Sequence, residues 1–400
     1  MYQFSKIVNS LRTSEIRDLM GLATRADIIS FAGGMPNDDL FPIKEINEIY
    51  NNLAGQVKKT AFQYGPTPGY PPLLESVKEY MRNKGLPVDD NKILITTGSL
   101  QAINILAKVF IDPGDVAIME NPSFIGGISA FKSYLADIRS VPMDQDGIII
   151  EKLEELLNDK KINPKLVYVT PFFHNPAGIM YSTERRQQLI NTLKGRNIPL
   201  IEDDAYGELY FDENDKTQLT PIKAVAPSDL TVCYTSSFSK ILGPGMRLGW
   251  MLVPPQIYEK CELCKQSMDA CSPNFTQVLA NEFLVQGKIY PYIAELRKIY
   301  KERKDIMINV LNEYMPKHED IKWVEPRGGF YIWISLPEYV DATDVLKKTI
   351  EGGAVFVVGK TFDPDAKKNN FIRLSFSNMP IEDIEKGVKI IANSLKPFIK

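Results

Sequence analysis

The chain contains little histidine and little cysteine. His174 and His318 are the only histidines among its 400 residues, and there are four cysteines. Two imidazoles leave little for a histidine-rich metal site, and four cysteines in so long a chain do not make a disulfide scaffold. The Cys261-x-x-Cys264 spacing, with Cys271 nearby, can suggest zinc, but a fourth ligand is not evident. Structural thiols are the better interpretation, and we expect no metal.

The chain also lacks a long apolar run and an excess of one charge. No stretch approaches the ~18 apolar residues of a membrane span, and the charged N-terminus, MYQFSKIVNSLRTSEIRDLM, is unlike a secretory signal. Lysine and arginine number 47 against 50 aspartates and glutamates, a net charge of -3. That balance argues against a nucleic-acid or anionic-membrane surface. We expect a cytoplasmic protein with neither kind of partner.

From residue 92 onward, short apolar runs alternate with amphipathic stretches. Alternation of this kind predicts an α/β fold, with a mainly parallel sheet covered by helices. The predicted strands are Lys92–Thr96, Val116–Glu120, Leu166–Thr170, Pro199–Asp203, Thr231–Ser236 and Leu248–Val253. The predicted helices are Ser99–Val109, Ser123–Tyr134, Thr183–Lys194 and Gln256–Met268.

The pattern changes after a long amphipathic helix predicted at Pro291–Tyr314. Short strands are predicted at Phe330–Ser335, Ala354–Val358 and Phe371–Phe376, with helices at Thr343–Glu351 and Ile381–Ser394. This pattern is typical of a smaller α+β domain. We expect a large domain over 43–290, and a small domain made from 1–42, as an arm, together with 291–400.

The most informative segment runs from Tyr234 to Trp250, YTSSFSKILGPGMRLGW. Three hydroxyls, a lysine and an arginine crowd a Gly/Pro-rich turn: Ser236, Ser237, Ser239, Lys240 and Arg247. Hydroxyls and an arginine fork suit a phosphate group, and the lysine would be free to form a Schiff base with an aldehyde. The alternative is a polar turn with a solvated lysine.

Two segments that follow other strands add polar groups. In Gly98-Ser99-Leu100-Gln101 a helix begins, and its free N–H groups suit a phosphate, although Ser99 could be only an N-cap. Asp203 could hold a pyridinium nitrogen protonated, and the hydroxyl of Tyr206 could bond a phenolate oxygen. The alternative is an acidic loop after a strand.

A further strand is followed by His174-Asn175-Pro176-Ala-Gly178. The proline and glycine fix the turn, and Asn175 can donate an amide hydrogen bond. We expect His174 to be structural. These segments together predict one ligand, a phosphorylated pyridine aldehyde, which is pyridoxal phosphate (PLP). Its chemistry needs a lysine, a carboxylate, partners for the ring hydroxyl and a cup for the phosphate.

With these motifs the chain resembles fold-type I PLP-dependent aminotransferases of class I/II. It is most similar to their aminoadipate/kynurenine aminotransferase branch. The resemblance runs from Ser30-Phe-Ala-Gly33-Gly34-Met-Pro36, through Tyr64-Gly-Pro-Thr-Pro-Gly69 and the segments above, to Phe371-Ile-Arg373-Leu-Ser-Phe-Ser377. It therefore covers nearly the whole chain.

The resemblance implies roles for the residues around the cofactor. Lys240 would form the Schiff base and move the substrate proton. Asp203 would pair with the pyridinium nitrogen, and Tyr206 and Asn175 would bond the ring hydroxyl oxygen. The phosphate would be held by Ser99, Leu100, Gln101, Ser237, Ser239 and Arg247.

Other residues are implied at the substrate and at a second subunit. Arg373 would grip the substrate α-carboxylate as a bidentate fork, beside Asn175 and the backbone of Gly34. Tyr64 would reach the partner subunit's cofactor phosphate and substrate, which implies a homodimer with shared active sites. Phe124 stands where the branch usually has a tyrosine stacked on the ring, so the aromatic face is kept and the hydroxyl is lost.

The implied reaction is ping-pong transamination between an L-amino acid and a 2-oxo acid such as 2-oxoglutarate. A C–S lyase or a decarboxylase of the same fold would share cofactor and fold, and it remains the alternative. A transcription regulator with an aminotransferase-like body is a more distant one. It needs an N-terminal DNA-binding domain, and Phe31-Ala-Gly-Gly34 comes too early for that.

Arg17, in Ser14-Glu-Ile-Arg17, matches an arginine that this branch uses for a substrate side-chain carboxylate. In that role it would favour 2-aminoadipate or glutamate, with aromatic or branched amino acids also open. The alternative is a surface arginine on an arm helix.

If Arg17 binds a side-chain carboxylate, Arg17→Ala should raise the KM for 2-aminoadipate more than the KM for an aromatic donor. Steady-state kinetics with both donors measure this difference. Equal changes for the two donors would count against the side-chain role.

Overall fold

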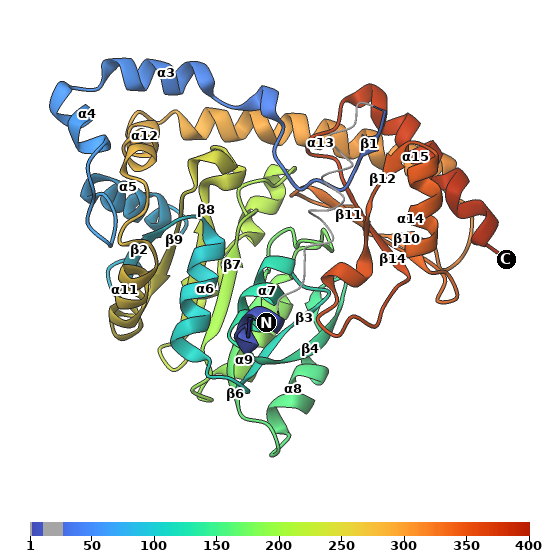
Figure 1. Ribbon diagram of the computed structural model, residues 1–400, viewed down its shortest axis with the longest axis horizontal. Coiled ribbons are helices and arrows are strands. Elements are labelled where there is room, and N and C mark those ends of the chain that lie inside the picture. The colour runs from blue at the N-terminus through green and yellow to red at the C-terminus, as the bar shows by residue number, and fades with distance from the viewer. Residues whose placement is uncertain (1, 11–26) are drawn as a thin grey trace.

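The computed structural model describes residues 2–10 and 27–400, and an eight-stranded sheet forms its centre (Figure 1). The order of the strands is β2 (Lys92–Thr96), β9 (Gly249–Val253), β8 (Val232–Ser237), β7 (Leu200–Asp204), β6 (Pro164–Val169), β3 (Val116–Asn121), β4 (Asp137–Asp144) and β5 (Gly147–Ile148). Strands β8, β7, β6, β3 and β4 are parallel, whereas β9 is antiparallel to both of its neighbours. The predicted α/β fold with a mainly parallel sheet is confirmed.

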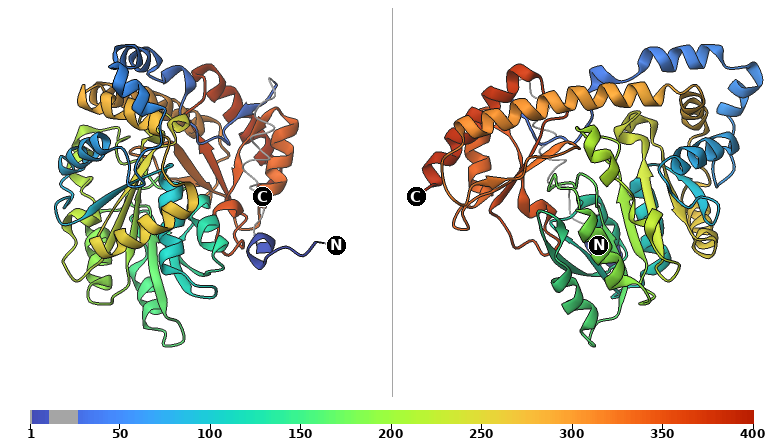
Figure 2. Two further views of the ribbon diagram at one scale, coloured as in Figure 1. Left: turned by 60° about the vertical axis from the view of Figure 1, so that its left-hand side comes forward. Right: turned by 180° about the vertical axis from the view of Figure 1, so that it is seen from behind.

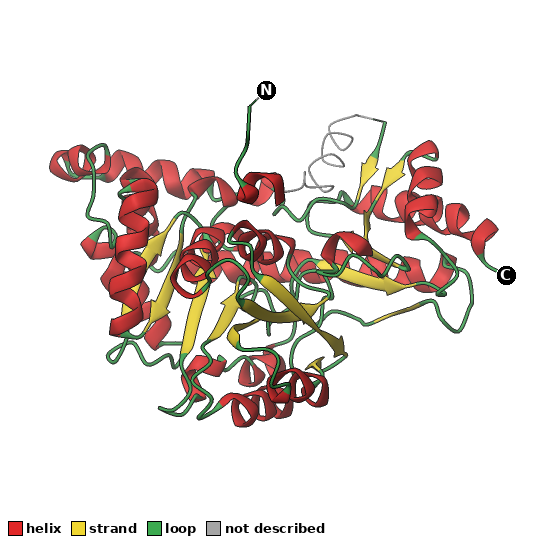
Figure 3. Ribbon diagram, turned by 60° about the horizontal axis from the view of Figure 1, so that its bottom comes forward, coloured by secondary structure: helices red, strands yellow, loops and turns green. Residues whose placement is uncertain are grey.

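Helices cover both faces of this sheet (Figure 3). Successive side chains of a strand point to opposite faces, so Leu166 and Tyr168 enter one apolar cluster while Val167 and Val169 enter another. The first cluster includes side chains of α6 (Ser99–Phe110), α7 (Ile125–Ser133) and α11 (Pro255–Asp269). The second includes side chains of α8 (Ile150–Asn158), α9 (Thr183–Leu193) and α10 (Ile222–Val225).

The carboxyl ends of β2, β3, β6, β7 and β8 lie at one edge of the sheet. Strand β2 shares this direction because β9, which is antiparallel to both β2 and β8, lies between them. Open α/β sheets bind ligands at such an edge. Gly249 in β9 brings the start of α6 close, since a Cβ at this position would lie 2.7 Å from the backbone of Gly98 and Ser99.

A second sheet is antiparallel, in the order β10 (Lys322–Trp323), β11 (Tyr331–Ser335), β14 (Phe371–Ser375), β13 (Val357–Val358). Helices α14 (Ala342–Glu351) and α15 (Ile381–Leu395) belong to the same part of the chain. The 26-residue helix α13 (Ile289–Tyr314) runs from the side of the large sheet to this smaller one (Figures 1 and 2).

The N-terminal segment joins the C-terminal part. Strand β1 (Ile29–Ser30) pairs with β12 (Ala354–Val355). The N–H of Phe31 donates to the oxygen of Val355 at 2.8 Å, and the N–H of Ser375 donates to the oxygen of Phe31 at 3.0 Å. These bonds carry the following residues, Ala32 to Met35, toward the sheet edge. The domain boundaries expected at 42/43 and 290/291 stay a prediction.

The remaining helices are shorter or lie at the periphery. They are α1 (Lys6–Ser10), α3 (Ile43–Asn52), α4 (Gly55–Ala61), α5 (Pro71–Arg82) and α12 (Asn274–Val285), with 3-10 turns η1 (Asp38–Leu40), η2 (Glu213–Gln218), η3 (Phe238–Lys240), η4 (Pro244–Met246), η5 (Gly359–Phe362) and η6 (Lys396–Phe398). None of the helices described is long and apolar enough to cross a membrane.

The structure differs from the sequence-based expectation at one predicted strand. Ala354–Val358 is not a single strand: Ala354 and Val355 pair with β1, whereas Val357 and Val358 pair with β14. The buried Phe356 lies between the two pieces. The run is uniformly apolar because both pieces are buried, so hydropathy alone does not reveal the change of partner.

The packing of the N-terminal segment on α15 can be tested at Gly387. A Cβ there would overlap the ring of Phe31, so Gly387→Ala should lower the thermal midpoint by a few degrees through overpacking, about 1–3 kcal/mol. Gly55→Ala is the matched control, because nothing lies within 4 Å of its Cβ position. Thermal unfolding of both variants checks this, and an unchanged midpoint for Gly387→Ala would contradict the packing.

Candidate active site

A cavity of about 340 Å³ opens at the carboxyl edge of the large sheet. We call it the lysine cavity. It brings together twelve of the residues singled out from the sequence: Gly34, Ser99, Leu100, Phe124, Asn175, Asp203, Tyr206, Ser237, Ser239, Lys240, Arg247 and Arg373. These residues come from seven separate stretches of chain, which only the fold places side by side.

Lys240 stands at the end of η3, the turn that directly follows β8. Its Nζ donates to the backbone oxygen of Gly34 at 2.8 Å and lies 5.6 Å from the centre of the Tyr206 ring. Burial, with the nearby cations Arg373 and Arg247, lowers the pKa of Lys240 from 10.5 to about 8. A much larger fraction of this amine is therefore neutral near physiological pH than of an ordinary lysine, and the neutral form is the nucleophile.

Asp203 occupies the end of β7, with its carboxylate buried. The strand register places it opposite Thr235, whose Oγ1 donates to Oδ1 at 2.9 Å, and the hydroxyl of Tyr168 donates to Oδ2 at 2.8 Å. Burial, reinforced by the nearby Asp204 and Glu120, outweighs these hydrogen bonds and raises the pKa of Asp203 to about 6. A cation in the cavity would offset this cost.

The start of α6 could hold an anion. Gly98 is the N-cap and has no side chain to cap the helix, and the N–H of Gln101 turns back to the oxygen of Gly98 at 3.2 Å. Ser99 and Leu100, whose N–H groups come before it, line the cavity. Ser237 and Ser239 line the same wall, with their hydroxyl oxygens 2.8 Å apart. Among the residues that the structure describes, the Arg247 guanidinium donates only to the carbonyls of Pro244 and Thr97.

Arg373 lies on the opposite side of the cavity, in β14. Its Nη1 donates to Oδ1 of Asn175 at 2.9 Å and its Nη2 to the oxygen of Ala32 at 2.6 Å. Its guanidinium carbon lies 4.5 Å from the centre of the Tyr331 ring. Gly34 packs so closely there that a Cβ would overlap the Tyr331 hydroxyl.

A buried network fixes the loop that carries Asn175. The Nδ1 atom of His174 accepts the N–H of Ala177 at 3.2 Å, so the proton of the neutral ring is on Nε2, 3.1 Å from Glu120. Glu120 also accepts the Thr170 N–H and the Tyr181 hydroxyl. His174 is thus a structural residue of the loop, as expected.

Two expected residues do not line the lysine cavity, and a third is not described. Gln101 turns its side chain to Asp269, at 2.7 Å, and to the N–H of Thr97, also at 2.7 Å. Tyr64 is 86% exposed, away from the cavity of its own chain. Arg17 lies outside the described residues.

The structure adds residues that sequence reasoning missed. The hydroxyls of Tyr331 and Tyr206 share a hydrogen bond of 2.9 Å. Tyr331 and Thr170 both line the cavity. Thr235 could have been found, since it lies two positions before Ser237 and on the same face of a predicted strand. Tyr331 could not, since it is 125 residues from Tyr206 and no local motif marks it.

The donor set fits PLP. In the part of the chain that the structure describes, Arg247 has no acidic partner, and the Nε atom of Arg373 is buried without a hydrogen-bond acceptor. A phosphate and a carboxylate are the acceptors that such groups select. The buried carboxylate of Asp203 suits a cationic ring nitrogen, and the Lys240 amine suits an aldehyde.

Comparison with known proteins agrees with this chemistry. The profile of the family "Aminotransferase class I and II" matches residues 26–391. The chain belongs to the class I and II aminotransferases. It is therefore a PLP-dependent enzyme, and Lys240, Asp203 and the open start of α6 are the groups on this chain that fit the cofactor.

Three relatives illustrate the similarity. An aromatic-amino-acid aminotransferase of Thermococcus litoralis is 36% identical, over 99% of this chain and 95% of that protein. A 2-aminoadipate transaminase of Thermus thermophilus is 34% identical, over 99% and 97%. The structure of a Pyrococcus horikoshii kynurenine aminotransferase superposes with a TM-score of 0.94 at 37% identity, covering 99% of this chain and 98% of that one.

The aminotransferase shows no sign of a metal centre within the described residues. No group of three or more histidine, cysteine or acidic side chains could hold a metal ion there. All four cysteines are free, and those at 233 and 261 are buried.

The lowered pKa of Lys240 predicts a distinctive reactivity in the cofactor-free protein. The rate of its modification by trinitrobenzenesulfonate should rise with pH to a midpoint of about 8, because the neutral amine is the nucleophile. Exposed lysines should follow a midpoint near ~10.4. Peptide mapping identifies the Lys240 product, and Lys240→Ala removes it. A midpoint near that of the other lysines would contradict the effect of burial.

Proposed function

We propose that this aminotransferase moves the amino group of an L-amino acid to a 2-oxo acid such as 2-oxoglutarate, by a ping-pong mechanism. The observation that carries the proposal is a single cavity holding a lysine amine of lowered pKa, a buried carboxylate and an arginine fork, at Lys240, Asp203 and Arg373. This is the set that transamination of an α-amino acid needs.

Arg373 binds the α-carboxylate of the substrate. Asn175 and the oxygen of Ala32 hold its two Nη groups, and the Tyr331 ring supports its plane. The guanidinium is thus fixed before a substrate carboxylate arrives, which lowers the entropy cost of orienting it. The buried Nε gains the acceptor that it lacks.

Proton transfer falls to Lys240. When bound, PLP supplies an electron sink for the bond that breaks at the substrate Cα. The Nζ of Lys240 takes the proton from that carbon, and its pKa of about 8 leaves it able both to accept and to return a proton. Asp203 would hold its charge toward the ring nitrogen, and Tyr206, whose hydroxyl is hydrogen-bonded to that of Tyr331, would offer a partner to the ring oxygen.

For the substrate, we propose 2-aminoadipate and glutamate, with aromatic or branched amino acids also accepted. The names of the relatives support this range, since they include aromatic, 2-aminoadipate and kynurenine enzymes. The cavity wall supports it too: Met35, Leu100, Phe124 and Ile125 provide apolar surface opposite the polar groups. Arg17 is the residue proposed for a second carboxylate.

We also propose a homodimer with shared active sites. Tyr64 is 86% exposed and Phe62 is 74% exposed, on the segment between α4 and α5. Large aromatic rings this exposed are suited to a protein interface. In the dimer, Tyr64 would complete the phosphate site of the partner subunit.

Lys240→Ala should abolish transamination while leaving the fold intact. Removing the nucleophile and proton carrier is expected to lower kcat by at least ~10²–10⁴-fold. The assay follows 2-oxo acid release from L-glutamate, with circular dichroism to check folding. Lys160→Ala, which changes an exposed lysine after α8, is the matched control and should keep full activity. Full activity in Lys240→Ala would contradict the assignment.

A further inference from the structure

Two tyrosine hydroxyls lie side by side in the wall of the lysine cavity. Tyr206 follows β7 and is 4% exposed, and Tyr331 begins β11 and is 2% exposed. Their hydroxyl oxygens are 2.9 Å apart, and their rings meet edge to face. Among the described residues, neither hydroxyl has a second hydrogen-bond partner. The pair therefore has two protons for one hydrogen bond, and one proton is left for a third group.

Close packing holds the Tyr331 side chain in place. A Cβ at Gly34 would overlap the Tyr331 hydroxyl, so the backbone of residue 34 lies directly against it. The guanidinium carbon of Arg373 lies 4.5 Å from the centre of the Tyr331 ring. The oxygen of Gly34 also accepts from Lys240 at 2.8 Å. The Tyr331 phenol therefore cannot swing away without disturbing the residues that face the substrate.

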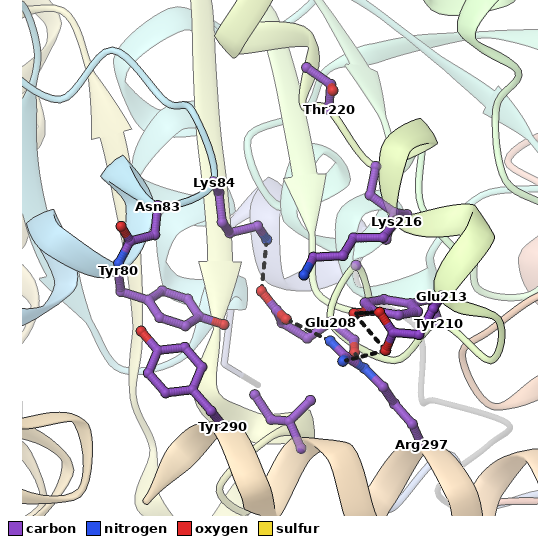
Figure 4. A pocket seen from close by; sticks show the side chains of 13 residues that line it. Tyr80, Asn83, Lys84, Glu208, Tyr210, Glu213, Lys216, Thr220, Tyr290 and Arg297 are labelled. Atoms are coloured by element: carbon purple, nitrogen blue, oxygen red, sulfur yellow. Dashed lines mark hydrogen bonds and ion pairs between the residues drawn. The ribbon is translucent and has the colours of Figure 1, made fainter. Parts of the chain in front are cut away.

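The backbone that carries Tyr206 is held by charged groups from outside the lysine cavity. Asp204, two residues before it, accepts from Lys84 at 3.0 Å, and Glu208, two residues after it, lies 3.3 Å from the same Nζ. Arg297 of α13 donates to Glu208 as well, at 3.1 Å. Figure 4 shows Lys84 and Arg297 meeting at Glu208, in a cavity of about 470 Å³ that Tyr206 does not line. The segment is thus fixed at both ends, and it presents the Tyr206 ring to the lysine cavity.

The order of the two protons follows from the acceptors that are present. Burial and the neighbouring Tyr331 raise the pKa of Tyr206 well above its usual range, with Arg373 opposing and Asp203 adding to the effect. Tyr206 therefore keeps its proton near neutral pH, beside the Lys240 amine 5.6 Å from its ring centre. If Tyr206 donated to Tyr331, the Tyr331 proton would have no acceptor in the described part of the chain. If Tyr331 donates instead, the Tyr206 proton is free for an acceptor in the cavity.

We propose that Tyr331 is a positioning residue that donates its hydrogen bond to Tyr206, so that Tyr206 donates its own proton to the ring oxygen of PLP. The inference rests on the proposed function, in which that oxygen lies at Tyr206. A hydroxyl that accepts one hydrogen bond becomes a stronger donor in the next. A hydrogen bond to the ring oxygen favours the form in which that oxygen is charged. Tyr331 therefore acts on the cofactor through Tyr206.

The test is the pH midpoint at which the visible band of the PLP bound to the holoenzyme changes, as the site around its ring oxygen loses a proton. Tyr206→Phe loses the bond to that oxygen and should raise the midpoint by about 1–2 pH units. Tyr331→Phe keeps the ring and removes only the hydroxyl, so it should raise the midpoint by about 0.2–0.5 of a pH unit, because the bond is weakened rather than lost. In a Tyr206→Phe background the second change should add nothing, since its effect passes through Tyr206.

Tyr300→Phe is the matched control. Tyr300 is buried like Tyr331, and its ring packs against Phe330 with the ring centres 4.8 Å apart. Its hydroxyl accepts the N–H of Asn37 at 3.4 Å. Tyr300→Phe should therefore leave the spectroscopic midpoint unchanged, because its hydroxyl is bonded to Asn37 rather than to Tyr206. The thermal midpoint of the cofactor-free protein should fall by a similar amount in Tyr300→Phe and Tyr331→Phe, since each loses one buried hydrogen bond.

Each outcome decides the question. A shift for Tyr331→Phe that vanishes in the Tyr206→Phe background supports the proposal. Equal shifts in both backgrounds would mean that Tyr331 meets the PLP itself, and this would overturn the proposed order of donors. No shift in either background, or the same shift for Tyr300→Phe, would overturn it too.

Transamination is read separately, from the 2-oxoglutarate that L-glutamate releases. Tyr331→Phe should retain this release, because Lys240, Asp203 and Arg373 are unchanged. A failed order of hydrogen bonds would therefore leave the proposed function standing. An absence of release from the unaltered enzyme would contradict the proposed function, whatever the midpoints show.

Discussion

The carboxylate of Asp203, buried at the end of β7, is the constraint on which the rest of the active site depends. A buried carboxylate is costly unless hydrogen bonds and a cation compensate it. The strand register supplies the hydrogen bonds from Thr235 and Tyr168. In the proposed function, the cationic ring nitrogen of PLP would supply the rest. This requirement explains why the sheet edge presents one acid among hydroxyls, with Lys240 directly after the adjoining strand β8.

The other walls of the cavity carry positive groups that have no acidic partner among the described residues. Burial, with Arg373 and Arg247 nearby, lowers the pKa of the Lys240 amine to about 8. Within residues 2–10 and 27–400, Arg373 and Arg247 donate only to neutral groups, which would leave their charge for a carboxylate and a phosphate. A site that already contained compensating acids would bind its anions weakly. The cavity is thus preorganised for anionic partners rather than for its own stability.

Much of this arrangement could be predicted from the sequence, because it follows from local motifs at strand ends. The positions of Ser99, Asp203 and Lys240 after apolar runs identify the sheet edge. What could not be predicted depends on contacts between distant segments. Tyr331 reaches Tyr206 only through the fold, and Gln101 turns away because Asp269 and Lys265 lie nearby. Helix α12 was missed because buried polar residues, among them Asn274 and Gln277, interrupt its apolar pattern.

The most direct test of this account is the visible absorbance of the purified holoenzyme, before and after L-glutamate is added alone. The account predicts that the band of the bound PLP is replaced by that of its pyridoxamine form, with one equivalent of 2-oxoglutarate released per active site. A band that neither glutamate nor any other amino acid changes would contradict transamination. No band, even after reconstitution with PLP, would contradict the assignment of Lys240 and its phosphate site.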